Sequence, residues 1–211
     1  MRSIRPILNQ LSKEELLEEI NFMFDLQPSI LALMPGKEQF RSVIKLQNKD
    51  ELVKFLLDVA EGNKSMNQIY ILKYGRNLPE VLKALHPLVV GISSAPTSEL
   101  RQANKVLIYS AIEARIRLKS FETAFDVGLE ALIKVYEYEI RYRIADFAEL
   151  NVAFLNYFDK IFADPDFPDA RKQAVLKQVK KNIEAPQMEK MGGLKKTLEK
   201  WYSLQVEKQS K

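Results

Sequence analysis

In the stretch Val135–Ile144, VYEYEIRYRI, aromatic or aliphatic residues alternate with charged ones from Tyr136 onward. Strict alternation is typical of a half-buried β-strand, and interleaved aromatic and basic residues also occur on nucleic-acid-binding surfaces. The flanking residues favour a helix instead, because apolar side chains continue at helical spacing on both sides and no turn residue interrupts them. Those flanking residues are Leu129, Leu132 and Ile133 before the stretch and Phe147, Leu150 and Phe154 after it.

In a helix, Glu137 precedes Arg141 by four residues, and Glu139 stands in the same relation to Arg143. Each such pair stabilises a helix by only about 0.2–0.5 kcal/mol. The two glutamates also neutralise the two arginines, which weakens a nucleic-acid interpretation. We therefore expect the stretch to be the middle of a long helix running from about 121 to 162. Tyr138 and Tyr142 would share one face of it, as candidates for contact with a neighbouring helix or subunit.

The composition as a whole favours helices. Gly occurs 7 times in 211 residues, Thr occurs only at 97, 123 and 197, and Leu, Ala, Glu and Lys dominate. These four residue types lose little side-chain freedom in a helix. We expect an all-α fold with long antiparallel helices in the C-terminal half. The alternative is an α+β fold with a small parallel sheet in residues 42–93, where the apolar runs 42–46, 68–74 and 87–92 could be strands.

Local signals mark several helix boundaries. Ser12 followed by Glu15, and Asn48 followed by Glu51, are capping-box patterns. The turn-rich segment Ser93–Ser98 is followed by a pattern that predicts a helix over 98–118. We place a domain boundary there: residues 1–95 form an N-terminal helical subdomain (α/β in the alternative with a sheet), and residues 96–211 form a long-helix bundle with a basic tail.

Several kinds of catalytic or metal site are disfavoured by the residues present. The chain has no Cys and a single histidine, His86, so thiolate chemistry is excluded and a Ser–His–Asp triad would depend on His86 alone. Counted from Asp164, the chain lacks the mid-loop Gly and the twelfth-position Glu of an EF-hand, and Asp164 or Asp166 is expected to cap the next helix. We expect no catalytic residues, no metal, no cofactor and no enzymatic activity.

The positive charge is concentrated in the last fifth of the chain. Residues 170–211 contain 11 Lys/Arg and 4 Asp/Glu, a net +7, whereas residues 1–169 contain 21 and 24, a net −3. Such a segment can attract phosphates or an acidic protein, or can simply be solvated. The basic-surface candidates are Arg171, Lys172, Lys177, Lys180, Lys181, Lys195 and Lys196.

Trp201, the one tryptophan, and the adjacent Tyr202 are further interaction candidates, because Trp and Tyr are favoured anchors of protein interfaces. Trp201 can equally pack against its own core.

The missing catalytic set, the long helices and the charge asymmetry together predict a non-enzymatic scaffold, adaptor or assembly component. It would contact another protein, or form a homo-oligomer, through residues 98–162. The alternative is a nucleic-acid-binding protein that uses the basic segment 171–200. With no signal-peptide pattern and no membrane-length apolar run, we expect a cytoplasmic protein without a membrane span.

Overall fold

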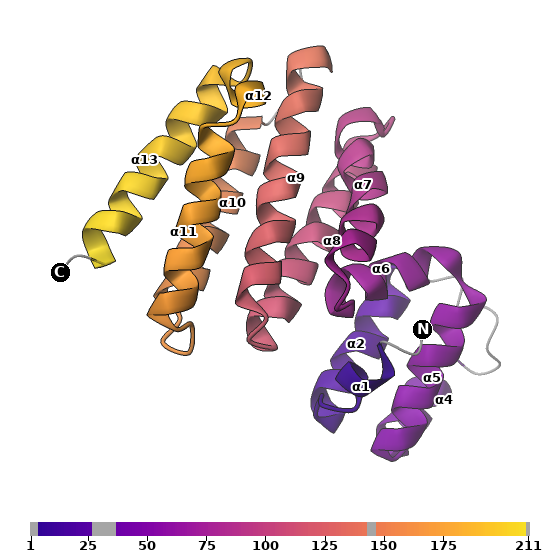
Figure 1. Cartoon of the computed structure of the whole chain (residues 1–211). Helices are drawn as coiled ribbons and strands as arrows, with labels where there is room; N and C mark the ends of the chain where they lie inside the picture. Colours follow the sequence, from indigo (N-terminus) through magenta and orange to yellow (C-terminus); the bar gives the residue numbers. More distant parts are fainter. Residues whose placement is uncertain (1–3, 27–36, 143–146, 210–211) are drawn as a thin grey trace. The chain divides into compact units, whose positions relative to one another are not determined.

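The computed structural model describes residues 4–26, 37–142 and 147–209 (Figure 1). Within these residues every regular element is a helix, which confirms the all-α expectation. The alternative of a parallel sheet in residues 42–93 is wrong. That region is occupied by α4 (Lys37–Leu46), α5 (Lys49–Gly62), α6 (Lys64–Tyr74) and α7 (Leu78–Ser94). Its apolar runs lie on helices, and periodicity alone does not distinguish so short a run from a strand; in the run 42–46 only Ile44 is buried.

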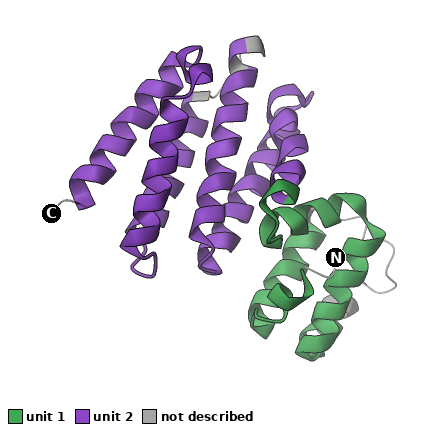
Figure 2. Ribbon diagram, in the orientation of Figure 1, with its two compact units in different colours: residues 1–80 green, residues 81–211 purple. Residues whose placement is uncertain are grey.

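The contacts divide the chain into two compact units, Met1–Glu80 and Val81–Lys211 (Figure 2). The boundary between these units, at 80/81, lies near the start of α7. The boundary predicted from the sequence, at 95/96, lies after the end of α7. The segment Ser93–Ser98 does end a helix, but α7 packs against the helix that comes after this turn. At Gly91 an added Cβ would clash with the side chain of Asn104, so the two helices approach closely there.

The first unit contains α1 (Arg5–Leu8), α2 (Lys13–Leu26), α4, α5 and α6. Both predicted capping boxes are present. The Ser12 hydroxyl accepts from the Glu15 amide at 3.1 Å while the Glu15 carboxylate accepts from the Ser12 amide at 2.7 Å. Asn48 and Glu51 make the same reciprocal pair at 3.0 Å in each direction. These bonds satisfy amides that a helix start leaves free.

The second unit begins in α7 and contains α8 (Ser98–Arg117), α9 (Phe121–Tyr142), α10 (Phe147–Ala163), α11 (Asp169–Ile183), α12 (Pro186–Glu189) and α13 (Gly192–Gln209). The predicted helix over 98–118 is confirmed as α8. The prediction of a single helix from 121 to 162 is wrong, because α9 and α10 are separate helices that pack side by side. The rings of Phe125 and Phe158 lie 4.4 Å apart between them.

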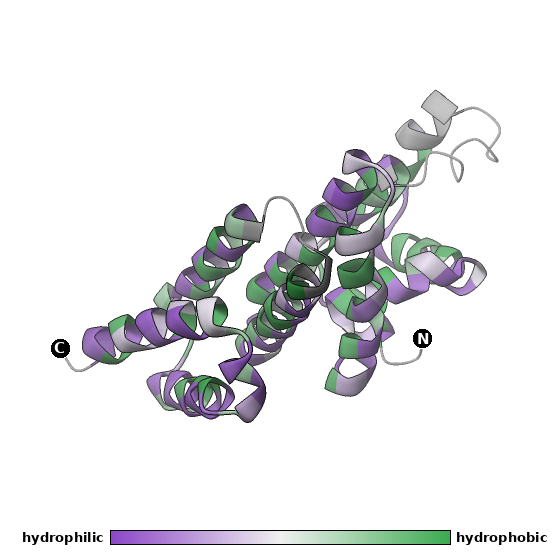
Figure 3. Cartoon of the chain, turned by 90° about the horizontal axis from the view of Figure 1, so that it is seen from above, coloured by the Kyte–Doolittle hydropathy of each residue, from purple (hydrophilic) through white to green (hydrophobic). Residues whose placement is uncertain are grey.

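Several long helices of the second unit contact helices one and two places away along the chain. The helix α8 contacts α9 and also α10, where Tyr109 meets Phe154 with ring centres 5.6 Å apart. The helix α9 likewise contacts α11, where Gln178 donates to Asp126 at 2.9 Å, and α13 packs on α10 and α11. This stacking needs an apolar stripe on each helix, and Figure 3 shows hydrophobic and hydrophilic residues alternating along them.

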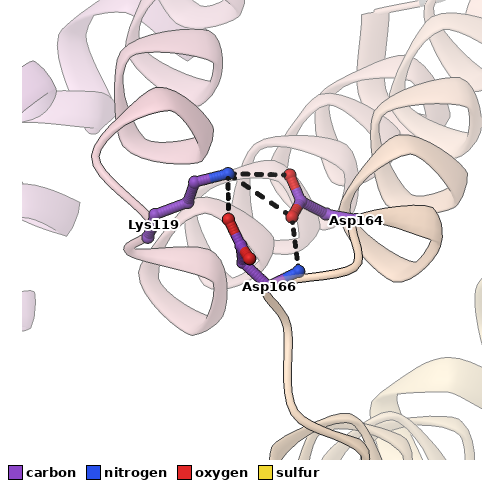
Figure 4. Close-up of polar contacts among 3 residues, drawn as sticks. All are labelled: Lys119, Asp164 and Asp166. Atoms are coloured by element: carbon purple, nitrogen blue, oxygen red, sulfur yellow. Dashed lines mark hydrogen bonds and ion pairs between the residues drawn. The ribbon is translucent and has the colours of Figure 1, made fainter.

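The turn after α8 is tied to the turn after α10 by Lys119 (Figure 4). Its Nζ lies 2.9 Å from Asp166 Oδ2 and 3.4 Å from Asp164 Oδ2, and the hydrogen bond to Asp166 raises the pKa of Lys119. Lys119 has φ 56°, which directs the chain from α8 into α9. The expectation that Asp164 or Asp166 caps the next helix is wrong, since the N-cap of α11 is Pro168 and no side chain caps it.

Candidate functional site

The tyrosines of the VYEYEIRYRI stretch lie at the C-terminal end of α9. Tyr136 faces the start of α13, where a Cβ added to Gly193 would clash with its hydroxyl. Tyr138 is half-buried, and the side chain of Tyr142 lies outside the described residues. The same holds for the side chains of Arg141 and Glu139, so the two proposed ion pairs of this stretch lie outside the described residues. The close approach at Gly193 therefore ties this end of α9 to α13.

The sequence left two alternatives for Trp201, packing in its own core or contact with a partner. In the structure Trp201 packs inside the second unit. Its ring centre lies 5.6 Å from that of Phe125, 5.7 Å from Phe158 and 5.1 Å from Phe162. The indole Nε1 donates to Asp159 Oδ1 at 3.0 Å, which satisfies its one donor. The neighbouring Tyr202 is half-buried. Trp201 thus joins α13 to α9 and α10.

Four of the seven basic candidates lie beside a carboxylate. Arg171 binds Glu122 of α9 with two guanidinium nitrogens. Lys195 binds Glu189, Lys180 lies 3.9 Å from Glu184, and Lys172 lies 3.8 Å from Asp169. These carboxylates break up the basic surface that the charge count predicts.

The other three, Lys177, Lys181 and Lys196, are not buried and make no ion pair with any residue that the structure describes. Lys177 and Lys181 are exposed and lie one turn apart on the outer side of α11.

A face formed by α8 and α10 was not singled out by the sequence. Both helices run antiparallel to α9, so they point in the same direction (Figure 1). Tyr109 of α8 meets Phe154 and Tyr157 of α10, with ring centres 5.6 and 5.4 Å away. About one turn earlier on each helix stand Val106 and Val152, with 42% and 59% of their surface exposed. The two valines are therefore at about the same level. Val106 stands one turn from Tyr109 on α8, whereas Val152, two residues from Phe154 and five from Tyr157, lies on the side of α10 opposite its buried residues.

Two glutamates, Glu113 and Glu149, lie at the edges of this face. The Tyr157 hydroxyl donates to Glu113 at 3.2 Å. Burial is the largest cause that raises the pKa of Tyr157, and the charge of Glu113 is the next. Burial raises the pKa of Tyr109 to about 12, and the charge of Glu149 adds to this shift. Both phenols are therefore neutral at physiological pH. We call this set, Val106, Tyr109, Val152 and Tyr157 between Glu113 and Glu149, the α8–α10 face.

A shallow hollow of ≈ 420 Å³ lies on α10 and shares Val152 and Glu149 with this face. Its other lining residues are Ala148, Ala153 and Asn156. An apolar centre with aromatic side chains and a charged rim is a composition found in protein interfaces. Among the described residues, no group of three or more acidic or histidine side chains is arranged to hold a metal ion.

Comparisons of the chain with protein-family models, with curated proteins and with solved structures find no match. Across the described ranges, no helix combines the length and the apolar character that crossing a bilayer requires.

Proposed function

We propose that this chain is a non-enzymatic scaffold or adaptor that binds another protein through its α8–α10 face. The observation that carries the proposal is the exposure of Val106 and Val152 at one level of α8 and α10, two helices that meet through the tyrosine pair of Tyr109 and Tyr157. Large exposed aliphatic side chains on adjacent helices gain free energy when a partner covers them. The face lies within residues 98–162, where the sequence predicts protein contacts.

The energetics favour a partner that covers more than the two valines. Full burial of one valine side chain is worth about 1.5–3 kcal/mol, and both are already partly covered. Association itself costs at least about 4 kcal/mol, and a stable interface buries about 800 Å² on each partner. The contact must therefore extend over the tyrosines to Glu113 and Glu149. The partner is expected to present an apolar side chain between basic ones, since the glutamates favour positive charge.

The proposal is tested by Val152→Arg, with Val43→Arg as the matched control. Val43 lies on α4 of the first unit and is 47% exposed, so both changes place a charge on an exposed helical position and are expected to alter stability by less than about 0.5 kcal/mol. The tagged chain is purified from its native source after nuclease treatment. A protein that accompanies the wild type and the control, but not Val152→Arg, supports the proposal.

Equal recovery of every companion protein with all three chains would contradict it. Light scattering on the purified chain identifies a second copy as the partner, if the wild type and the control are dimers and Val152→Arg is a monomer. A face shared by two copies would be self-complementary around a two-fold axis.

Nucleic-acid binding is the second candidate, and the exposed lysines of α11 favour it. Lys177 and Lys181 stand one turn apart without an ion pair among the described residues. Against it, the neighbouring Arg171 and Lys180 lie beside carboxylates. Replacing Lys177, Lys180 and Lys181 by Glu should abolish binding to duplex DNA or RNA at low salt, and wild-type affinity should fall steeply with salt. Unchanged binding by the triple variant excludes this candidate.

A further inference from the structure

A polar groove of ≈ 400 Å³ lies at the end of the second unit where α10 ends, α11 begins and α13 ends. Seven polar residues on its wall are Asp159, Asp169, Lys172, Gln173, Gln205, Lys208 and Gln209. We call it the C-terminal groove. Its volume falls in the range of small-ligand sites, roughly 300–1,000 Å³. It shares no residue with the α8–α10 face, so a ligand in this groove does not depend on the proposed function.

The groove exists because polar residues occupy inward positions of two helices. In α11, Lys172 precedes the buried Val175 and Val179 by three and seven residues, so its stem lies on the buried side. The side chain is only 13% exposed. In α13 the buried series Leu194, Leu198, Trp201 continues with Gln205, and the exposed Lys208 follows three residues later on the same side of the helix. Apolar side chains at these positions would close the gap that the polar ones leave open.

Part of the polar wall is already satisfied within the protein. Asp159 Oδ1 accepts from Trp201 Nε1 at 3.0 Å and from Gln205 Nε2 at 2.6 Å. The Gln173 amide donates to the side-chain oxygen of Gln209. These bonds hold the wall in place without any ligand.

The remaining donors of the wall have weak acceptors, or none among the described residues. Gln209 Nε2 is buried and has no hydrogen-bond partner there. Lys172 Nζ lies 6.0 Å from the ring centre of Phe167, and its ion-pair partner is Asp169, 89% exposed, at 3.8 Å. That separation exceeds a hydrogen bond, and an exposed pair is weak. Lys208 reaches the same groove and makes no ion pair within the described part of the chain.

We propose that the C-terminal groove binds a carboxylate, with Lys172 and Lys208 as its counter-charges and Gln209 Nε2 as a hydrogen-bond donor. A buried donor without an acceptor, beside two ammonium groups, favours an anionic oxygen ligand. The aspartates Asp159 and Asp169 on the same wall repel a dianion more strongly than a monoanion, which favours a carboxylate over phosphate. The carboxylate belongs either to a small free acid or to the C-terminus of a polypeptide.

Trp201 is a built-in reporter for this site. It is the only tryptophan in the chain, so its indole N–H gives one separate signal in a ¹H–¹⁵N spectrum. That N–H is bonded to Asp159 on the groove wall. The full-length labelled chain is titrated separately with acetate, with N-acetyl-trialanine bearing a free carboxyl terminus, with the same peptide amidated, and with inorganic phosphate. The expected result is a saturable shift of the indole signal with a free carboxylate and none with the amide.

The variants Lys172→Met and Lys208→Met should each weaken this binding on the order of tenfold or more, because each removes a charged donor. Lys177→Met, an exposed lysine of α11 outside the groove, is the matched control and should bind as the wild type does. Circular dichroism checks that each variant is folded. Lys208 is exposed, so its variant keeps the test valid if Lys172→Met unfolds.

The two carboxylate titrations identify the source of the carboxylate. Peptide affinity at least about tenfold above that of acetate identifies a polypeptide terminus, and equal affinities identify a small free acid. The proposal is overturned if the amidated peptide binds as tightly as the acid or if phosphate binds more tightly than either carboxylate. It is also overturned if both methionine variants bind like the wild type, or if no titration moves the indole signal at millimolar concentration.

Discussion

Replacing Lys73 by methionine should destabilise the first unit by about 3–5 kcal/mol. Lys73 of α6 and Glu19 of α2 form an ion pair in which both side chains are only 4% exposed. The Lys73 Nζ lies 2.6 Å from both carboxylate oxygens and 4.4 Å from the ring centre of Phe22. Methionine keeps the length and volume of the lysine stem but removes the charge, so the change isolates the electrostatic contribution.

The expected magnitude can be worked out from this geometry. At an effective dielectric constant of about 20, the attraction across 2.6 Å is about 6 kcal/mol. Removing each ion from water costs several kcal/mol, so the intact pair contributes little net stability. The single change loses the attraction but keeps the cost of burying Glu19. The double change Glu19→Leu with Lys73→Met removes both costs and should leave stability equal to, or greater than, that of the wild type.

Urea unfolding with two probes measures the effect. Far-UV circular dichroism monitors the helices of both units, whereas fluorescence of Trp201 monitors the second unit alone. In Lys73→Met, part of the dichroism should be lost at lower urea while the fluorescence midpoint stays at its wild-type value. A loss of about 3–5 kcal/mol is a large part of the total stability of a domain, so the early transition should be well separated.

Two results would refute this reasoning. One is a Lys73→Met variant whose dichroism transition coincides with that of the wild type. The other is a double variant as unstable as the single one, which would mean that packing and not charge sets the cost.

Three further changes test other contacts. Gly128→Ala should destabilise the protein by about 1–2 kcal/mol in urea unfolding, because the added Cβ would lie 2.8 Å from Phe158 Cε1 in the core. The cost of this clash outweighs the higher helix propensity of alanine. Tyr70→Phe should raise the thermal midpoint by removing a buried hydroxyl that has no hydrogen-bond partner among the described residues, a gain of about 1 kcal/mol; a lower midpoint contradicts this. Burial raises the pKa of Asp126, so its ionised form costs stability above that pKa and the cost vanishes as pH falls through it. Asp126→Asn, which keeps the acceptor for Gln178, should therefore stabilise at pH 7 and have no effect below about pH 3.5; a gain of equal size at both pH values would exclude the charge as its cause.

The helix boundaries that rest on local contacts were predictable from the sequence. Ser12 with Glu15 and Asn48 with Glu51 interact over three residues, so their spacing alone indicates the cap. The division of residues 121–162 into two helices was not predictable, because the sequence between Tyr142 and Phe147 contains neither Gly nor Pro. The packing of α10 on α9, with Phe158 against Phe125, decided it.

The candidate sites show the same dependence on distant contacts. The lysines of the C-terminal segment could be counted from the sequence. Which of them bind carboxylates could not, because Arg171 meets Glu122 from a helix about fifty residues earlier. The inward position of Lys172 was readable in principle, since it stands at helical spacing from Val175 and Val179. Its place in a groove depends on α13 packing alongside α11.

The sequence by itself determined the helical class, the capped helix starts and the excess of positive charge at the C-terminal end, because composition and contacts within one turn fix all three. Only the tertiary structure decided which apolar side chains remain in water. Val106 directly precedes the buried Leu107 and Ile108, and nothing local distinguishes the three. Their exposure is set by where α9 and α10 lie against α8. The α8–α10 face and the C-terminal groove are therefore properties of helix packing, which brings together residues far apart in the chain.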